Sequence, residues 1–237
     1  AKAKVPVTEQ DELKQQAALA ALALVQSGMT LGLGTGSTAK HFVAQLGERM
    51  ARGALTDIRG VPTSSATAQQ AAALGIPLSG LTAEGVDPAV DGMDEYDDQL
   101  NAIKGLGGAL LREKVVAAAA AVFVLIGDST KHVARLGDKA PLPVEVAVFG
   151  WRRTARRLED LGALPTVRMA GGEEFLSDNG NLVLDCSFPD GLRPAELARA
   201  LCDVPGVLEH GMFLGMADRA FVATATGTLE LLGGNAR

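Results

Sequence analysis

Aromatic residues, histidine and cysteine are all scarce in this chain. Of its 237 residues only 4% are Phe, Trp or Tyr, and there are 3 histidines and 2 cysteines. Hydrophobic residues nevertheless make up 47% of the chain, so a substantial core must be built mainly from Ala, Val and Leu. Cys186 and Cys202 are too few for a disulfide framework. We expect both to be reduced core thiols in a cytoplasmic protein.

Excess positive charge and long apolar runs are also lacking. The 22 basic residues are outnumbered by 28 acidic ones, giving a net charge of −6, whereas nucleic-acid-binding domains usually carry a basic surface. The longest apolar runs, such as "VVAAAAAVFVLIG", are shorter than the roughly 18 residues of a membrane span. The opening residues, "AKAKVPVTEQDELK", hold no apolar segment typical of a secretory signal. We therefore expect a small-molecule ligand, no nucleic acid and no membrane.

Glycine, in contrast, is abundant, with 28 residues, and strand patterns alternate with helix patterns in the first half of the chain. Short apolar segments indicate buried strands over 29–34, 57–61, 86–92 and 121–128. Between them, alanine-rich segments predict helices over 9–26, 35–53, 64–75 and 107–121. This alternation predicts an α/β fold, with a Rossmann-like parallel sheet covered by helices on both faces.

From about residue 131 the order changes to βαββαβ. Strands are expected within 140–150, 165–170, 181–188 and 207–215, and helices over 151–162 and 194–206. This order is typical of a split βαβ, or ferredoxin-like, α+β unit. The segment 219–227 is expected to return to the main sheet as its last strand. We predict two domains, a Rossmann-like one over 1–130 plus 214–237 and a small α+β one over 131–213.

A glycine-rich turn, "GLGTGSTA", joins the first expected strand to the next helix. Free backbone N–H groups and the helix dipole favour an anion at such a place. The spacing lacks the third glycine of G-x-G-x-x-G and the G-K-[ST] ending of a P-loop. The turn is therefore either a cradle for a small phosphate or a structural turn with a serine cap, and the local sequence leaves both open.

An acidic run, "DGMDEYDD", begins where a buried strand ends. Asp91 lies at the carboxyl end of that strand, the edge where ligands bind in open α/β sheets, and Asp94 follows three residues later. The spacing does not fit a calcium loop, so we predict no metal site. For the remaining acids, Glu95, Asp97 and Asp98, we favour a solvated acidic turn.

The segment "KGLGGALLREK" holds two further candidate groups. The residues one helical turn from Glu113 are all apolar: Ala109, Leu110, Val116 and Ala117. Burial on that surface would raise the pKa of Glu113 toward the range of a general base. Because the helix is apolar nearly all round, a surface or salt-bridged glutamate is equally compatible with the pattern. Lys104 could neutralise a phosphate or an enolate oxygen, or lie exposed in a loop.

Eight segments in order make the chain resemble the type A ribose-5-phosphate isomerase family along nearly its whole length: "GLGTGSTA", "VPTSSATA", "VDGMDEYD", "IKGLGGALLREK", "IGDSTK", "PLPVEV", "DNGNLVLD" and "PGVLEHGMF". The resemblance implies interconversion of D-ribose 5-phosphate and D-ribulose 5-phosphate through a cis-enediolate, in the non-oxidative pentose phosphate pathway. It further implies that no metal or organic cofactor is needed, that the Rossmann-like domain is catalytic, and that the chain forms a homodimer or homotetramer.

The resemblance also implies residue roles. Glu113 is similar to the base that moves the proton between two sugar carbons, Asp91 to a helper in ring opening, and Lys104 to the group that stabilises the enediolate. Asp94 lines the site as a fourth catalytic residue. The implied substrate contacts are Thr35, Gly36, Ser37, Thr38, Asp91, Gly92, Met93, Asp94, Lys104, Gly105, Leu106, Gly107 and Lys131, with Lys14 as a further candidate. Leu106 and Met93 depart from the family pattern, where glycine and alanine are usual, and we expect altered kinetics from them.

Other functions fit the sequence less well. A non-catalytic sugar-phosphate sensor domain should accompany a helix-turn-helix and a basic surface, and neither pattern is present. A nicotinamide oxidoreductase should have the third glycine and an acidic residue about 20 positions after it. A hexosamine-phosphate isomerase-deaminase is closer in chemistry, but the eight segments fit it worse.

Overall fold

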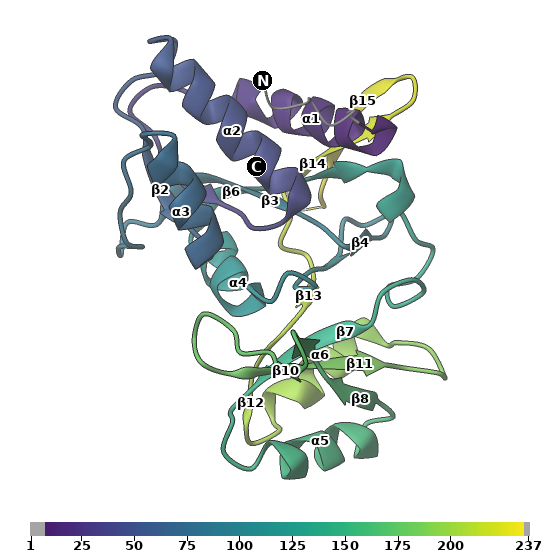
Figure 1. Ribbon diagram of the computed structural model, residues 1–237. Coiled ribbons are helices and arrows are strands. Elements are labelled where there is room, and N and C mark those ends of the chain that lie inside the picture. Colours follow the sequence, from purple (N-terminus) through teal and green to yellow (C-terminus); the bar gives the residue numbers. More distant parts are fainter. Residues whose placement is uncertain (1–7, 235–237) are drawn as a thin grey trace.

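The computed structural model describes residues 8–234; the segments 1–7 and 235–237 lie outside it, and with them the first half of the opening segment in which we expect no secretory signal. Its centre is a six-stranded sheet in the order β15-β14-β6-β3-β1-β2 (Figure 1). Neighbouring strands from β14 to β2 are parallel, and β15 pairs antiparallel with β14. The strands are β1 Thr30–Leu33, β2 Arg59–Pro62, β3 Val86–Gly92, β6 Ala120–Asp128, β14 Arg219–Thr224 and β15 Gly227–Leu232.

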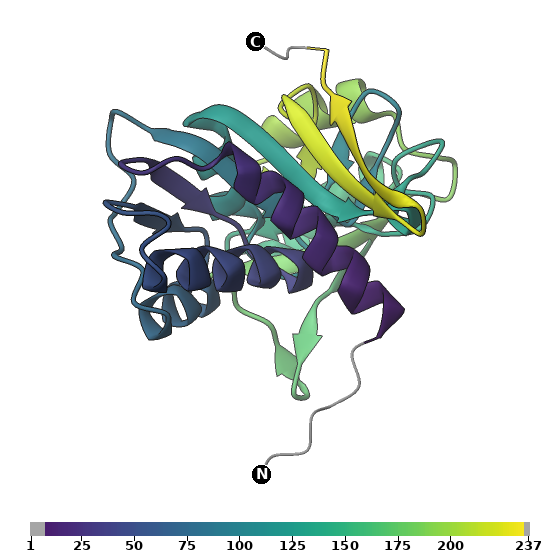
Figure 2. The same cartoon turned by 90° about the horizontal axis from the view of Figure 1, so that it is seen from above.

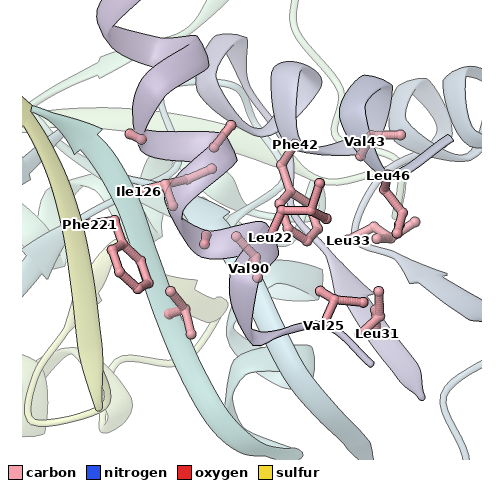
Figure 3. Close-up of a cluster of buried hydrophobic side chains, with 14 of the residues drawn as sticks. Leu22, Val25, Leu31, Leu33, Phe42, Val43, Leu46, Val90, Ile126 and Phe221 are labelled. Carbon is pink, nitrogen blue, oxygen red and sulfur yellow. The ribbon is translucent and has the colours of Figure 1, made fainter. Parts of the chain in front are cut away.

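Helices cover both faces of this sheet, as the sequence predicts. On one face lie α1 (Glu9–Ala21) and α2 (Ser37–Ala51), side by side in Figure 2. Apolar side chains of α2, Phe42 and Leu46 among them, and Leu22 just after α1 meet those of β1, β3 and β6 in the core of Figure 3. On the other face α4 (Leu110–Ala118) packs against β3 and β6. Helix α3 (Ser65–Ala73) packs against α2.

Several expected elements differ from the structure in their bounds or in their number. The helix expected over 9–26 ends at Ala21 and continues only as a 3-10 turn, Leu22–Leu24. The helix expected over 107–121 is α4, which begins at Leu110 because Gly105 and Gly108 adopt positive φ angles of 106° and 81°. The strand over 207–215 divides into β12 (Val207–His210) and β13 (Met212–Phe213), and β15 rather than β14 is the last strand of the main sheet.

A second sheet has the order β12-β7-β11-β8, with every neighbouring pair antiparallel. Its elements follow as β7 Leu142–Val146, α5 Trp151–Asp160, β8 Leu164–Val167, β11 Leu182–Ser187, α6 Pro194–Cys202 and β12 Val207–His210. This confirms the ferredoxin-like unit. A hairpin that the sequence did not predict, β9 Met169–Ala170 and β10 Glu173–Glu174, lies between β8 and β11. Cys186 is buried, but Cys202 is exposed, so the expectation of two core thiols is wrong for Cys202.

A third sheet, β4 Glu95–Tyr96, β5 Ala102–Ile103 and β13 Met212–Phe213, brings distant parts of the chain together. Glu95 is fully buried there, where it accepts hydrogen bonds from the N–H groups of Gly137, Lys139 and Ala140. The expectation of a solvated turn is therefore wrong for Glu95. No described helix is long and apolar enough to cross a membrane.

We propose the domain boundaries suggested by the sequence, 1–130 plus 214–237 and 131–213. The second sheet and its two helices support this division because they enclose an apolar cluster of their own, from Leu142 to Met212. The pairing of β13 with β5 ties the end of the smaller unit to the larger one.

Candidate active site

The carboxyl ends of β1 and β3 form the centre of the site. In the main sheet β2 lies on one side of β1 and β3 lies on the other, so the strand order reverses between β1 and β3. Open α/β sheets bind their ligands at such a point. Here the N–H groups of Thr35 and Gly92 donate to Asp91 Oδ1 at 3.0 and 2.7 Å. A Cβ on Gly34 would lie 2.2 Å from the same oxygen, so this close approach requires glycine.

Lys104 forms ion pairs with both Asp91 and Glu113 near this edge of the sheet. Its Nζ lies 3.0 Å from Asp91 Oδ2 and 3.3 Å from Glu113 Oε2, and it donates to the carbonyl of Gly92 at 2.5 Å. The three charged side chains are only 2–3% exposed. Lys104 is therefore not an exposed loop lysine, and Glu113 is not a surface glutamate but a buried one that is ion-paired with Lys104.

Two buried carboxylates share one ammonium in this cluster. Burial raises the pKa of Glu113 to about 8, and the nearby charge of Asp91 adds to the effect. Burial also raises the pKa of Asp91, although the Lys104 ammonium opposes it. Burial alone would lower the pKa of Lys104, but the two carboxylates raise it, so Lys104 is charged. Asp91 accepts two N–H hydrogen bonds that Glu113 lacks, and such bonds favour the ionised form of a carboxyl group.

Hydroxyl groups gather beside the glycine-rich turn. Thr35 Oγ1 lies 2.8 Å from the hydroxyls of both Thr63 and Ser64, and Thr67 Oγ1 donates to the carbonyl of Gly34 at 2.9 Å. The sequence analysis missed Thr63, Ser64 and Thr67 as members of this group, and Ser64 is also the N-cap of α3. The signal was present, because "TSSAT" follows β2 as "TGST" follows β1.

Helices α2 and α3, which follow β1 and β2, begin at this edge, and of these two only α3 has a side-chain cap. The N-cap of α3 is Ser64, whose hydroxyl accepts from Thr67 N–H, and Asp178 accepts from Ser65 N–H at 2.6 Å. The N-cap of α2 is Gly36, which has a φ of 116° and no side-chain acceptor. The first N–H groups of α2, beginning at Ser37, are therefore open to an external anion.

The loop from Lys104 to Gly108 faces the turn at Thr35. Leu106 N–H donates to Asp94 Oδ2 at 3.0 Å, which brings Asp94 to this loop. A Cβ on Gly107 would lie 3.7 Å from Thr35 Cγ2. The two glycine-containing loops, one after β1 and one after β5, therefore approach each other across the site.

Three sequence candidates lie apart from the ion-pair cluster. The Met93 side chain is buried in the core, where a Cβ on Gly127 would lie 2.7 Å from its Cε. Lys131 follows β6 in a 3-10 turn at the same sheet edge and is half-buried. Lys14 lies on α1 and pairs with Asp11 at 3.7 Å.

The sequence analysis also missed Phe213, on β13. Its ring centroid lies 5.3 Å from Lys104 Nζ and 5.0 Å from Lys114 Nζ, so it offers an aromatic face to both ammonium groups. Within residues 8–234, no three His, Cys, Asp or Glu side chains are grouped in a way that could hold a metal ion.

Comparisons with known proteins agree on one family. Residues 59–227 match the family model described as ribose 5-phosphate isomerase A (phosphoriboisomerase A). The chain is 51% identical to ribose-5-phosphate isomerase A of Roseiflexus sp. over 226 residues, covering 94% of this chain and 97% of that protein. The solved ribose 5-phosphate isomerase of Plasmodium falciparum has a TM-score of 0.92 and 36% identity, covering 94% of this chain and 99% of that one. A D-ribose-5-phosphate isomerase in complex with phospho-erythronic acid has a TM-score of 0.91 and 38% identity, covering 95% and 100%.

Proposed function

The chain belongs to the ribose 5-phosphate isomerase A family and is an aldose–ketose isomerase of D-ribose 5-phosphate and D-ribulose 5-phosphate, and we propose that the Asp91–Lys104–Glu113 cluster carries the reaction. The observation that supports this most is the buried Lys104 ammonium, which lies within 3.3 Å of both carboxylates. The reaction belongs to the non-oxidative pentose phosphate pathway.

In the proposed mechanism Glu113 moves one proton between two carbons. With the sugar in its open-chain aldehyde form, the ionised Glu113 takes the proton from C2, and the electron pair moves onto the aldehyde oxygen to form a cis-enediolate. The hydroxyl proton on O2 passes to O1, and Glu113 returns its proton to C1, which gives the ketose. No atom is gained or lost, and no electron leaves the substrate.

The electrostatics of the cluster suit this proton transfer. A carboxylate whose pKa is raised by burial to about 8 is a stronger base than an exposed one, and it can also return the proton near neutral pH. Lys104 stays charged beside it, so the ammonium can stabilise the oxyanion as it develops. Asp91 holds Lys104 in place and, by its position at the sheet edge, is the proposed helper in ring opening. Asp94 is the proposed fourth catalytic residue.

We propose that the substrate phosphate binds at the N-terminus of α2. The open N–H groups after Gly36, the nearby hydroxyls of Thr35, Ser37 and Thr38, and the lysine at 131 support this position. The backbone of the loop over 105–107 and of Gly92 and Met93 would contact the sugar. We also propose that no metal or organic cofactor takes part, since acid–base groups account for every step.

The test is the conversion of ribose 5-phosphate to ribulose 5-phosphate in EDTA, for the native chain and for Glu113→Gln. Loss of a general base lowers kcat by about 10²-fold or more. Glu196→Gln, at an exposed position of α6, is the matched control and should keep native activity. An inert native chain that still binds the sugar phosphate would favour the sensor alternative, and a fully active Glu113→Gln would show that another group is the base.

We further propose a cytoplasmic homo-oligomer, a dimer or tetramer, that does not bind nucleic acid. The net charge of −6 supports the last point. Light scattering of the full chain would give the number of subunits.

A further inference from the structure

Arg168, a residue of the smaller unit, reaches the glycine loop of the site. It lies between β8 and β9, and its side chain is 13% exposed. Asp185 on β11 anchors the guanidinium through two parallel hydrogen bonds, one of them from Nε to Oδ2 at 3.0 Å. Such a two-point pair fixes the plane of the guanidinium as well as its position.

The remaining arm of the guanidinium holds two carbonyl groups of the loop. Arg168 Nη1 donates to Gly105 O at 2.9 Å and to Leu106 O at 3.0 Å. The ring of Phe175, at the other end of the β9–β10 hairpin, touches the same loop, since a Cβ on Gly108 would lie 2.4 Å from it. The smaller unit therefore contacts the loop at two successive peptide groups and at Gly108.

These hydrogen bonds fix the orientation of the peptide groups in the loop. The Gly105–Leu106 peptide is held at both ends, with its C=O on Arg168 and its N–H on Asp94. In the next peptide the Leu106 C=O is held by Arg168, so the N–H of Gly107 points the opposite way, as in any trans peptide. Among the described residues no backbone group accepts from this N–H, and Gly107 lies against Thr35 across the site.

We propose that Arg168, anchored by Asp185, is a positioning residue for the isomerisation: it fixes the 105–107 backbone so that Gly107 N–H faces the substrate and Asp94 stays at the loop. A glycine-rich segment has many accessible backbone conformations, and charged hydrogen bonds to two adjacent carbonyls select one of them. The inference rests on the proposed function of this site, because it assigns the loop a role in that reaction.

The test compares Arg168→Ala, Asp185→Asn and the double variant in steady-state kinetics. Misplacing a contact to the reacting atoms costs up to about 10²-fold in rate, so we expect kcat to fall about 10- to 10²-fold for Arg168→Ala while KM changes less than about threefold. The losses of the two single variants should not add, since both break one anchored unit. Added guanidinium ion should restore part of the kcat of Arg168→Ala, which a role in folding alone would not produce.

Arg219→Met is the matched control, because Arg219 also pairs with a carboxylate, that of Glu230 at 2.8 Å, but on the outer strands of the main sheet. It should keep native kcat. Unchanged kcat in Arg168→Ala, or a loss that guanidinium does not restore, would overturn the proposal. If Arg168→Ala does not fold, Asp185→Asn decides the question by its kcat. Failure of the proposed function is distinguishable, since it would appear in Glu113→Gln whatever the Arg168 variants do.

Discussion

Glu113 Oε2 lies 3.3 Å from Lys104 Nζ inside the protein, although the two residues belong to different elements. Lys104 follows β5, and Glu113 lies in the first turn of α4. The intervening loop turns back through Gly105 and Gly108, which adopt positive φ angles that other residues rarely take. The glycines therefore let one short segment supply both the ammonium and the base.

The activity of the native chain should depend on the ionisation of Glu113. Since burial raises the pKa of Glu113 to about 8, kcat/KM should rise with pH along a limb with a midpoint near that value. In Asp91→Asn the midpoint should move to lower pH, because the charge of Asp91 is the second cause of the raised pKa. The pH profiles of the two proteins give the comparison. A midpoint that stays fixed or rises in Asp91→Asn would contradict this account of the cluster.

Stability should fall as pH rises, and Glu113→Gln should reduce that fall. The pKa of Glu113 is raised from 4.5 to about 8 by folding, so between these values the folded chain keeps a proton that the unfolded chain has lost. The stabilising contribution is complete below 4.5 and is lost as pH rises through about 8. Free energies of unfolding in urea at the two ends of this range test the prediction. An equal decline in the native chain and in Glu113→Gln would refute it, and Glu196→Gln should decline as the native chain does.

Removing the ammonium of Lys104 should affect both rate and pKa. Lys104→Met leaves the oxyanion without its cation, and losing one such stabilising group lowers kcat by about 10²- to 10³-fold. It should also raise the pKa of Glu113 further, because Lys104 is the group that lowers it. The pH profile of the residual activity should therefore shift to higher pH. Lys104→Arg, which keeps the charge, provides the control: a pKa shift of the same size there would mean that geometry rather than charge is responsible.

Gly34→Ala should damage the site, whereas Gly80→Ala should not. A Cβ on Gly34 would lie 2.2 Å from Asp91 Oδ1 and 2.6 Å from Asp91 Cα, so Asp91 and its strand must shift. Overpacking of this kind costs about 1–3 kcal/mol, and the displaced carboxylate should also lower kcat. A Cβ on Gly80 meets no atom within 4 Å. The unfolding free energy and the turnover rate of both variants test this prediction. It is wrong if Gly34→Ala behaves like Gly80→Ala in both measurements.

The sequence predicted elements well where the local pattern is strong. The strand expected over 86–92 is β3 residue for residue, and Gly75, at the end of the helix expected over 64–75, has the positive φ angle typical of a residue that ends a helix. The hairpin at 169–174 and the two-residue strands β4 and β5 were missed because they are too short to show a periodicity. The strand expected over 207–215 is divided at Gly211 because its first half, β12, pairs with β7 and its second half, β13, pairs with β5.

The sequence by itself determined the fold class, the order of elements and the family, because alternating strand and helix patterns and eight ordered motifs are properties of the chain alone. Only the tertiary structure decided which charges are buried. It placed Lys104 and Glu113 inside and Cys202 outside, buried Glu95 under the loop of residues 137–140, and brought Arg168 to a loop 60 residues earlier in the chain. The desolvation that raises a pKa depends on which distant segments cover a group, and a local pattern holds no information about that.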